Sequence, residues 1–171
     1  MLLPNKEVPE IDLPLTIGAR FHLSKQSPKN FTLLVFYRGK HCPVCKNQLK
    51  DLSDKLDEFT KRGVNVFAIS MDSKERANVV HEEWDTGDVP LAYGLSEDAA
   101  RDWGLYISSA RDGSDEPEVF SEPGMFLVRP DMSLYFASTQ NAPFTRPPLG
   151  ELIQAIDYIL KNDYPARGAR T

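Results

Sequence analysis

Two short apolar runs with a helical stripe between them form the clearest pattern in the chain. Residues 31–37 are rich in β-branched and aromatic side chains, and residues 64–70 repeat this character at strand length. Both runs are therefore predicted to be buried strands. Between them, apolar residues recur every three or four positions, which predicts one amphipathic helix from Pro43 to the glycine at position 63. A strand, a helix and a second strand in this order predict a βαβ unit with parallel strands.

The remaining pattern extends this unit at both ends. Residues 1–30 contain four prolines and are predicted to be an extended lead-in with one short strand at 20–23. Asp72 and Glu75 match a capping box and predict the start of a helix. A short strand and a helix with Ser96 as its cap should follow. These expected elements, and those after them, are a strand at 89–93, a helix at 96–103, strands at 124–128 and 134–138, and a helix at 149–160.

Two segments outside these elements are predicted to be irregular. Residues 108–122 are polar and charged, so they are expected to form an exposed loop. Residues 163–171 are expected to form a loosely held tail. The strands at 124–128 and 134–138 are joined so briefly that they must pair antiparallel. The whole order predicts a single α/β domain, residues 1–171, with a mixed sheet.

Composition narrows the function and the compartment. The formal net charge is −5, from 20 basic and 25 acidic residues, which argues against nucleic acid or an anionic membrane as a partner. No apolar run approaches the length of a membrane span, and the first residues do not resemble a signal peptide. A cytoplasmic location is therefore predicted. In a reducing compartment, two cysteines are more readily explained by catalysis than by a structural disulfide.

Both cysteines lie at the predicted start of the first helix, in the sequence Cys42-Pro43-Val44-Cys45. Pro43 suits the first helical position because it has no N–H to leave unpaired. The helix N-terminus, with Arg38, Lys40 and Lys46 nearby in sequence, favours a thiolate over a thiol. Cys42 precedes the apolar stripe and should be the more exposed sulfur, while Cys45 should be the more sheltered one. A one-turn disulfide between them is geometrically reasonable.

Two other interpretations compete with redox chemistry. Free cysteines are often small buried hydrophobes, and both could belong to the core. A zinc site is the second alternative, but it needs about four ligands, and only His41 is close in sequence. The strand-turn-helix context favours the redox interpretation. No metal or other cofactor is predicted, and His41 is instead a candidate for tuning the cysteine pair electrostatically.

Four stretches carry a resemblance to a known family: residues 36–45, 66–70, 124–128 and 163–168. Together they resemble the thioredoxin fold, and in particular the peroxiredoxin-like members of the alkyl hydroperoxide reductase and thiol-specific antioxidant (AhpC/TSA) family. The resemblance covers nearly the whole chain. It implies a thioredoxin-like three-layer α/β/α sandwich around a central mixed sheet, in its peroxiredoxin-like variant.

The chain departs from that family at three positions. Peroxiredoxins resemble one another in a Pro-x-x-x-Thr-x-x-Cys motif and a distant arginine that together bind peroxide. Aligned on Cys45, this chain has Arg38 in place of the proline and Cys42 in place of the threonine. Pro123 stands where the arginine is expected, and it matches instead the cis-proline that faces the cysteine pair in thioredoxin-like dithiol sites. The alternative, a trans proline that ends the preceding loop, remains open.

A further candidate is Arg146, because residues 144–147 resemble a stretch that recurs in the same relatives. Arg146 is a weak candidate for an anion or substrate contact, and a surface position is the alternative.

These observations lead to three hypotheses. The first is thiol–disulfide exchange, in which the Cys42 thiolate attacks a protein or small-molecule disulfide and Cys45 resolves the mixed disulfide. The second is a thiol peroxidase, in which Cys45 attacks a hydroperoxide and Cys42 resolves the sulfenic acid. The third is a redox-inactive binding module. The first two require a cellular thiol reductant such as thioredoxin or glutathione, and the sequence leaves the oligomeric state open, a homodimer included.

Overall fold

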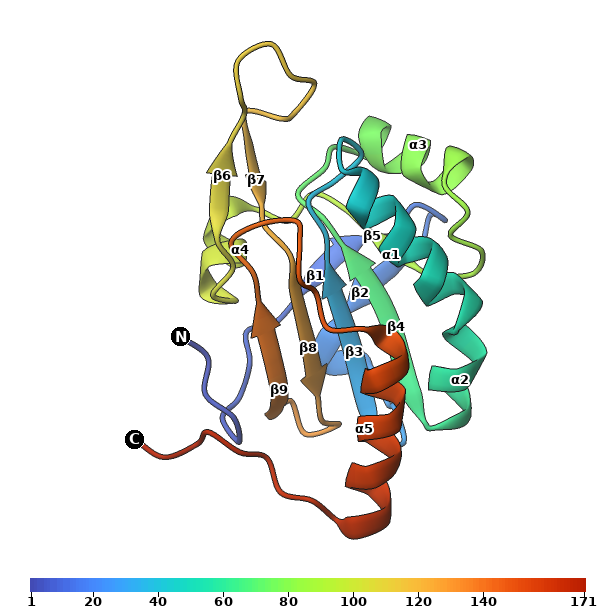
Figure 1. The fold of residues 1–171 in the computed structure, drawn as a ribbon, viewed down its shortest axis with the longest axis vertical. Coiled ribbons are helices and arrows are strands. Elements are labelled where there is room, and N and C mark those ends of the chain that lie inside the picture. Colours follow the sequence, from blue (N-terminus) through green and yellow to red (C-terminus); the bar gives the residue numbers. More distant parts are fainter.

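A computed structural model describes all residues, 1–171, and shows a five-stranded mixed sheet at the centre of the molecule (Figure 1). The strand order is β5-β4-β3-β8-β9. The parallel pairs are β3 (Phe31–Phe36) with β4 (Val64–Ile69), and β4 with β5 (Leu91–Ala92). The antiparallel pairs are β3 with β8 (Gly124–Val128), and β8 with β9 (Leu134–Thr139). The predicted βαβ unit and the predicted antiparallel strand pair are both confirmed.

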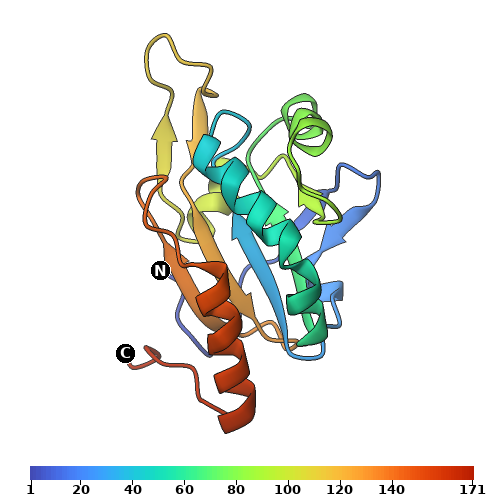
Figure 2. The same ribbon diagram turned by 45° about the vertical axis from the view of Figure 1, so that its right-hand side comes forward.

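The sheet is covered on both faces, which explains why every residue of β3 is buried. Because strand side chains alternate, Leu33 and Val35 join one core cluster, while Leu34 and Phe36 join another. The first cluster is completed by α1 (Pro43–Asp54), α2 (Leu56–Lys61) and α5 (Leu149–Asn162), with α3 (Lys74–Glu83) beside them. The second is completed by the N-terminal segment and α4 (Glu97–Asp102). Figures 1 and 2 show the resulting layers, as predicted for a thioredoxin-like α/β/α sandwich.

The first helix is not continuous. α1 ends at Asp54 and α2 begins at Leu56, with Lys55 out of helical geometry between them (φ −104°, ψ 2°). The predicted stripe still faces the core, since Leu49, Leu52 and Phe59 are all fully buried. The spacing of the apolar residues therefore predicted the buried face correctly but not the break in the helix.

The N-terminal lead-in holds more structure than the single strand expected at 20–23. β1 (Asp12–Pro14) and β2 (Arg20–His22) form an antiparallel hairpin, followed by the 3₁₀ turn η1 (Leu23–Lys25). Phe21 is fully buried and stacks on Phe67 at 3.9 Å between ring centroids. The segment thereby closes the second core.

Helix capping matches the prediction at one helix and not at another. Ser96 caps α4, and its side chain accepts a hydrogen bond from the N–H of Ala99. At α3 the cap is Ser73, which accepts from Arg76, so the capping box predicted on Asp72 is wrong. Asp72 is buried one residue earlier and serves a different contact, described below.

The segment expected to be an exposed loop is largely a hairpin. β6 (Ile107–Ser109) pairs with β7 (Val119–Ser121), and the hairpin extends beyond the end of the central sheet in Figure 1. Phe120 and Ser121 are buried, so the prediction of an exposed loop over 108–122 is wrong for the two strands. It is right for much of the polar tip between them. No helix in the structure combines the length and apolarity that crossing a bilayer requires.

A carboxylate fixes the turn between β3 and α1. Gly39 has φ +131°, and an added Cβ would lie 2.6 Å from Oδ1 of Asp72. Oδ2 of Asp72 accepts a hydrogen bond from the N–H of Lys40 at 2.8 Å. Asp72 therefore sets the path of the chain immediately before Cys42.

This geometry makes a stability prediction for Gly39. Gly39→Ala would add both backbone strain and a clash with Asp72, so we expect the free energy of unfolding to fall by about 2–4 kcal/mol in urea titrations. Gly113→Ala is the matched control, because Gly113 has φ +72° but open space around it. It should cost about 1 kcal/mol. Equal losses in the two variants would contradict the role of Asp72.

Candidate active site

The two cysteines lie at the N-terminus of α1, just beyond the carboxyl end of β3. Cys42 is the N-cap, Pro43 occupies the first helical turn, and the N–H of Cys45 donates to Sγ of Cys42 at 3.2 Å. The two sulfurs form a disulfide, and the two Cα atoms are 5.2 Å apart. The predicted placement of the pair at a helix start is confirmed.

Both sulfurs are sealed from solvent. Cys42 is 1% exposed and Cys45 is 0% exposed, so both are buried and the expected difference in exposure is negligible. Sequence placed Cys42 outside the helix, but it could not show that the loop between β9 and α5 covers this end of α1. Pro43, between them, is exposed.

Arg146 comes from that covering loop and contacts both sulfurs. Its Nη2 lies 3.0 Å from Sγ of Cys45 and 3.6 Å from Sγ of Cys42. The guanidinium is held in place by Nη1 donating to Oε1 of Gln48 at 2.5 Å and by Nε donating to the carbonyl of Pro143 at 2.8 Å. Burial, with a contribution from Arg38, lowers the pKa of Arg146 to about 10, so it remains a cation at neutral pH.

Gln48 is a site residue that the sequence did not predict. It lies three residues after Cys45, and this spacing puts two side chains on neighbouring positions of a helix surface. Arg146, a weak candidate in the sequence analysis, is the one whose side chain reaches the sulfurs.

Arg38 forms a buried ion pair at the edge of the site. In the register of β3 and β8, Phe36 is opposite Gly124, and extending it by two residues brings Arg38 beside Glu122. Nε of Arg38 lies 2.9 Å from Oε2 of Glu122, and the side chains are only 14% and 5% exposed. Oε1 of Glu122 accepts from the Ser108 hydroxyl at 2.7 Å. The charge of Arg38 is thus partly neutralised, and Glu122 is a site residue that sequence reasoning missed.

The β6–β7 hairpin also packs against the residues before Cys42. The Phe120 ring lies 4.9 Å from Cζ of Arg38 and 4.6 Å from the centre of the His41 ring. Burial, with a smaller contribution from Arg38, lowers the pKa of His41 to about 4. His41 is therefore neutral at pH 7 and adds no positive charge to the dithiol.

Lys40 and Pro123, the last two residues singled out in the sequence, make their hydrogen bonds through backbone atoms. Lys40 donates its N–H to Asp72, as described above, and its side chain makes no hydrogen bond or ion pair. The chain contains no cis peptide bond, so the expected cis-proline at Pro123 is wrong. The carbonyl of Pro123 accepts from the N–H of Gln140 at 3.0 Å.

Comparisons with known proteins identify the family. The family model described as AhpC/TSA matches residues 4–137, most of the chain. The chain belongs to the AhpC/TSA family. The predicted family, and with it thiol-based oxidoreductase chemistry, is thereby confirmed.

Among relatives of this AhpC/TSA protein, alkyl hydroperoxide reductase C of Staphylococcus aureus is 30% identical over 177 residues, covering 95% of this chain and 86% of the relative. Solved structures share the fold. The reduced 2-Cys peroxiredoxin of Plasmodium vivax gives a TM-score of 0.75 at 20% identity, covering 95% of this chain and 84% of that one. A yeast mitochondrial 1-Cys peroxiredoxin gives 0.75 at 19% identity, covering 95% and 78%.

The Arg38–Glu122 pair leads to a prediction about the dithiol. Nearby positive charge stabilises thiolates and hence the reduced form, which raises the reduction potential. We expect Glu122→Gln to raise the potential and Arg38→Gln to lower it, each by about 10–30 mV, measured against glutathione buffers. The double variant should return close to the starting value. Shifts of the same sign in both single variants would contradict this electrostatic coupling and indicate a merely structural pair.

Proposed function

We propose that this AhpC/TSA protein is a thiol-dependent peroxidase, in which Cys45 attacks a hydroperoxide and Cys42 resolves the product. The observation that carries the proposal is the 3.0 Å contact between Arg146 and Sγ of Cys45. A fixed guanidinium beside this sulfur stabilises its thiolate and can also donate to the peroxide oxygens as negative charge develops on the leaving oxygen. The name of the Staphylococcus aureus relative, alkyl hydroperoxide reductase C, supports the same substrate class.

In the proposed cycle, two electrons pass from the cysteine pair to the peroxide. The Cys45 thiolate bonds to one peroxide oxygen, the O–O bond breaks, and the leaving oxygen takes a proton to become an alcohol or water. Cys45 is then a sulfenic acid. The Cys42 sulfur attacks it, the disulfide forms, and hydroxide leaves with a proton as water. A dithiol reductant then supplies two electrons and two protons to restore both thiols.

The burial of both sulfurs also favours a small substrate. A hydroperoxide needs only a narrow opening beside Arg146 to reach Cys45, whereas a protein disulfide would have to displace the covering loop. We infer that the reductant is a cellular thiol of the thioredoxin or glutathione type. The printed title of the yeast 1-Cys peroxiredoxin structure names those two systems for that protein.

A second candidate function is thiol–disulfide exchange with Cys42 as the nucleophile. One observation favours it: Sγ of Cys42 accepts the N–H of Cys45 at the N-terminus of α1, an arrangement that stabilises a thiolate on Cys42. Both mechanisms end in the same disulfide, so the oxidised state does not distinguish them.

Single cysteine variants of the full chain separate the two functions. If Cys45 is peroxidatic, Cys42→Ser should react with hydrogen peroxide within about tenfold of the wild-type rate and accumulate a sulfenic acid that dimedone traps. Cys45→Ser should lose the fast reaction. The measurement is stopped-flow fluorescence with mass spectrometry of the adduct. The opposite pattern, with Cys45→Ser retaining the fast reaction, would overturn the proposal in favour of Cys42 as the nucleophile.

Arg146 should matter for chemistry and little for folding. Arg146→Gln keeps a polar side chain that can still reach Gln48, but it removes the cation beside Cys45. We expect the second-order rate constant with peroxide to fall about 10²-fold or more and the pKa of the reactive thiol to rise, as read from the pH dependence of that rate. Lys46→Gln removes an exposed cation of α1, the helix that carries Cys45, and is the control. Similar losses in the two variants would exclude a specific role for Arg146.

A further inference from the structure

The disulfide is covered by the loop that joins β9 to α5, residues 140–148, which we call the cover loop. In Figure 1 this segment crosses in front of β8 and β3 on its way to α5. Its Arg146 bonds to Gln48 and contacts both sulfurs. A thiol reductant must bring its own sulfur against a sulfur of the disulfide. It therefore has to contact the cover loop and move it.

The cover loop is strained next to Arg146. Thr145, the residue before it, has φ 56°, in the left-handed region that a β-branched side chain rarely adopts. Strain of this kind persists only while neighbouring contacts enforce it. The hydrogen bond from Arg146 to Gln48 of α1 is such a contact. A partner that moves Phe144, on the other side of Thr145, would therefore release the strain and withdraw Arg146 from the sulfurs.

The same loop presents an aromatic ring to solvent. Phe144 is 64% exposed, and Pro43, which stands between the two cysteines, is exposed as well. Aromatic residues are frequent anchors of protein–protein contacts. A protein can cover the Phe144 ring and use that contact to displace the loop, whereas a small thiol such as glutathione has little surface with which to do so. The surface above the disulfide therefore fits a protein.

The charge around the disulfide is of one sign. Residues 38–50 and 139–150 contain five basic residues and no aspartate or glutamate, although the chain as a whole carries a net charge of −5. Only part of this positive charge is paired, since the side chain of Lys40, two residues before Cys42, forms no ion pair. Positive charge at the rim of a contact favours an acidic surface opposite it.

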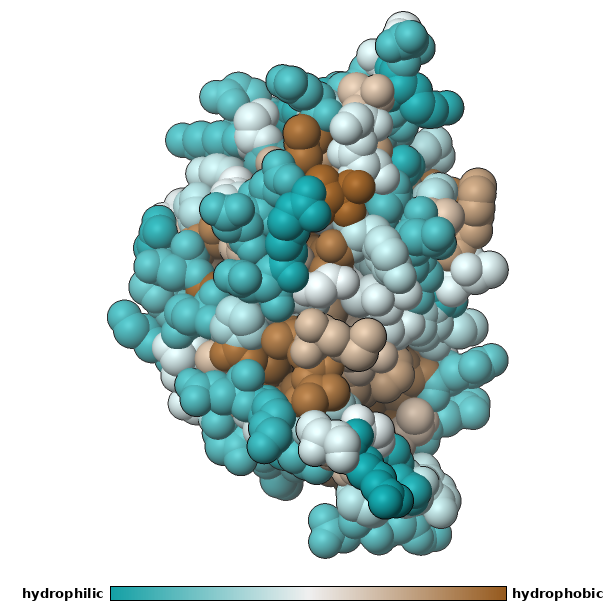
Figure 3. Space-filling view, turned by 90° about the vertical axis from the view of Figure 1, so that its left-hand side faces the viewer, coloured by the Kyte–Doolittle hydropathy of each residue, from teal (hydrophilic) through white to brown (hydrophobic).

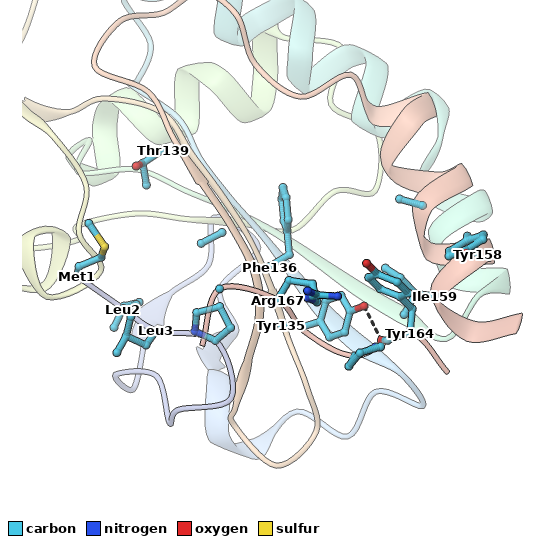
Figure 4. Close-up of a pocket in the computed structure, with 15 residues that line it drawn as sticks. Met1, Leu2, Leu3, Tyr135, Phe136, Thr139, Tyr158, Ile159, Tyr164 and Arg167 are labelled. Carbon is cyan, nitrogen blue, oxygen red and sulfur yellow. Dashed lines mark hydrogen bonds between the residues drawn. The ribbon is translucent and has the colours of Figure 1, made fainter. Parts of the chain in front are cut away.

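Another apolar area of the surface gives no access to the disulfide. Figure 3, which looks onto the side that carries both chain ends in Figure 1, shows apolar residues across the middle of that face. Figure 4 draws the residues of this area, which come from β9, α5 and both ends of the chain. There the Tyr135 hydroxyl donates to the carbonyl of Tyr164 at 2.8 Å and Ala166 is buried, so the tail predicted to be loose is anchored. No residue of the dithiol site lines this area.

We propose that a protein dithiol docks on the Phe144 ring and thereby opens the cover loop, and that its attacking cysteine lies among apolar and acidic residues. The partner's thiolate bonds to one sulfur of the disulfide, the S–S bond breaks, and the other sulfur leaves as a thiolate that takes up a proton. The partner's second thiol then attacks the mixed disulfide, so the partner becomes a disulfide and Cys42 and Cys45 are both thiols. The inference rests on the proposed function only in taking this disulfide as a step of the catalytic cycle.

The test starts from the oxidised full chain and uses no peroxide, so its outcome does not depend on which cysteine is peroxidatic. Reduction by a bacterial thioredoxin, kept reduced by its reductase and NADPH, is followed by acid quenching and maleimide labelling of free thiols. Phe144→Ser should lower the second-order rate constant of this reaction about tenfold or more, and Phe144→Tyr should retain the wild-type value. Reduction by dithiothreitol, which needs no docking, should be unchanged in both variants.

Ile17→Ser is the matched control, because Ile17 is also 64% exposed but lies in the turn between β1 and β2. It should leave reduction by thioredoxin unchanged. Added salt should slow reduction of the wild-type chain by thioredoxin but not by uncharged dithiothreitol.

Several results would overturn the proposal. One is an equal loss of rate with thioredoxin and dithiothreitol in Phe144→Ser, which would show that the ring only shapes the loop. Another is an equal loss in Ile17→Ser. A third is reduction of the wild-type chain by glutathione as fast as by thioredoxin, because the occupant of the surface would then be a small thiol. A thioredoxin reaction that salt does not slow would also contradict it.

Discussion

The contact between a buried guanidinium and two sulfur atoms is the constraint around which the site is arranged. Burying a cation is costly unless it is hydrogen-bonded or paired. Arg146 meets part of this cost with Gln48 and with the carbonyl of Pro143, but the sulfurs of the disulfide carry no charge to pair with it. Reduction creates a thiolate next to the guanidinium. The positive charge of Arg146 is therefore poorly compensated in the oxidised state and well compensated in the reduced state. This difference favours the reduced form.

The fold brings three segments that are far apart in sequence to one end of the sheet. The turn after β3 carries the cysteines, the residues before β8 carry Glu122, and the loop after β9 carries Arg146. β3 and β8 are neighbours and antiparallel, so the end of one strand lies beside the start of the other. β9 then returns along β8, so its carboxyl end lies at the same end of the sheet. Asp72, in the loop that follows β4, holds the turn before Cys42 through its hydrogen bond with the N–H of Lys40.

What the sequence predicted, and what it did not, follows from how far each interaction reaches along the chain. The buried strand, the helix stripe and the cysteine pair at a helix start depend on residues within a few positions of one another, and patterns of that range are visible in a sequence. The contact of Arg146 with Cys45 joins residues 101 positions apart. Its existence depends on how β9 and α5 pack, which no local pattern encodes.

The errors have the same origin. Asp72 matched a capping box, but a tertiary contact with the turn at Gly39 uses its carboxylate, and Ser73 became the cap. The polar composition of residues 108–122 describes the tip of a hairpin and hides Phe120, which is buried against His41. In each case packing between distant segments outweighed a local preference.

The spacing of the two cysteines has a consequence for the proposed peroxidase cycle. α1 begins at Pro43 with the disulfide already formed, so joining the sulfurs does not require the helix to unwind. When two reacting sulfurs start far apart, the chain must rearrange before they can bond. The finished disulfide, by contrast, is sealed beneath Arg146, so a reductant must open this cover to reach it. In the proposed cycle we therefore expect reduction of the disulfide, which requires the loop that carries Arg146 to move, to be slower than its formation.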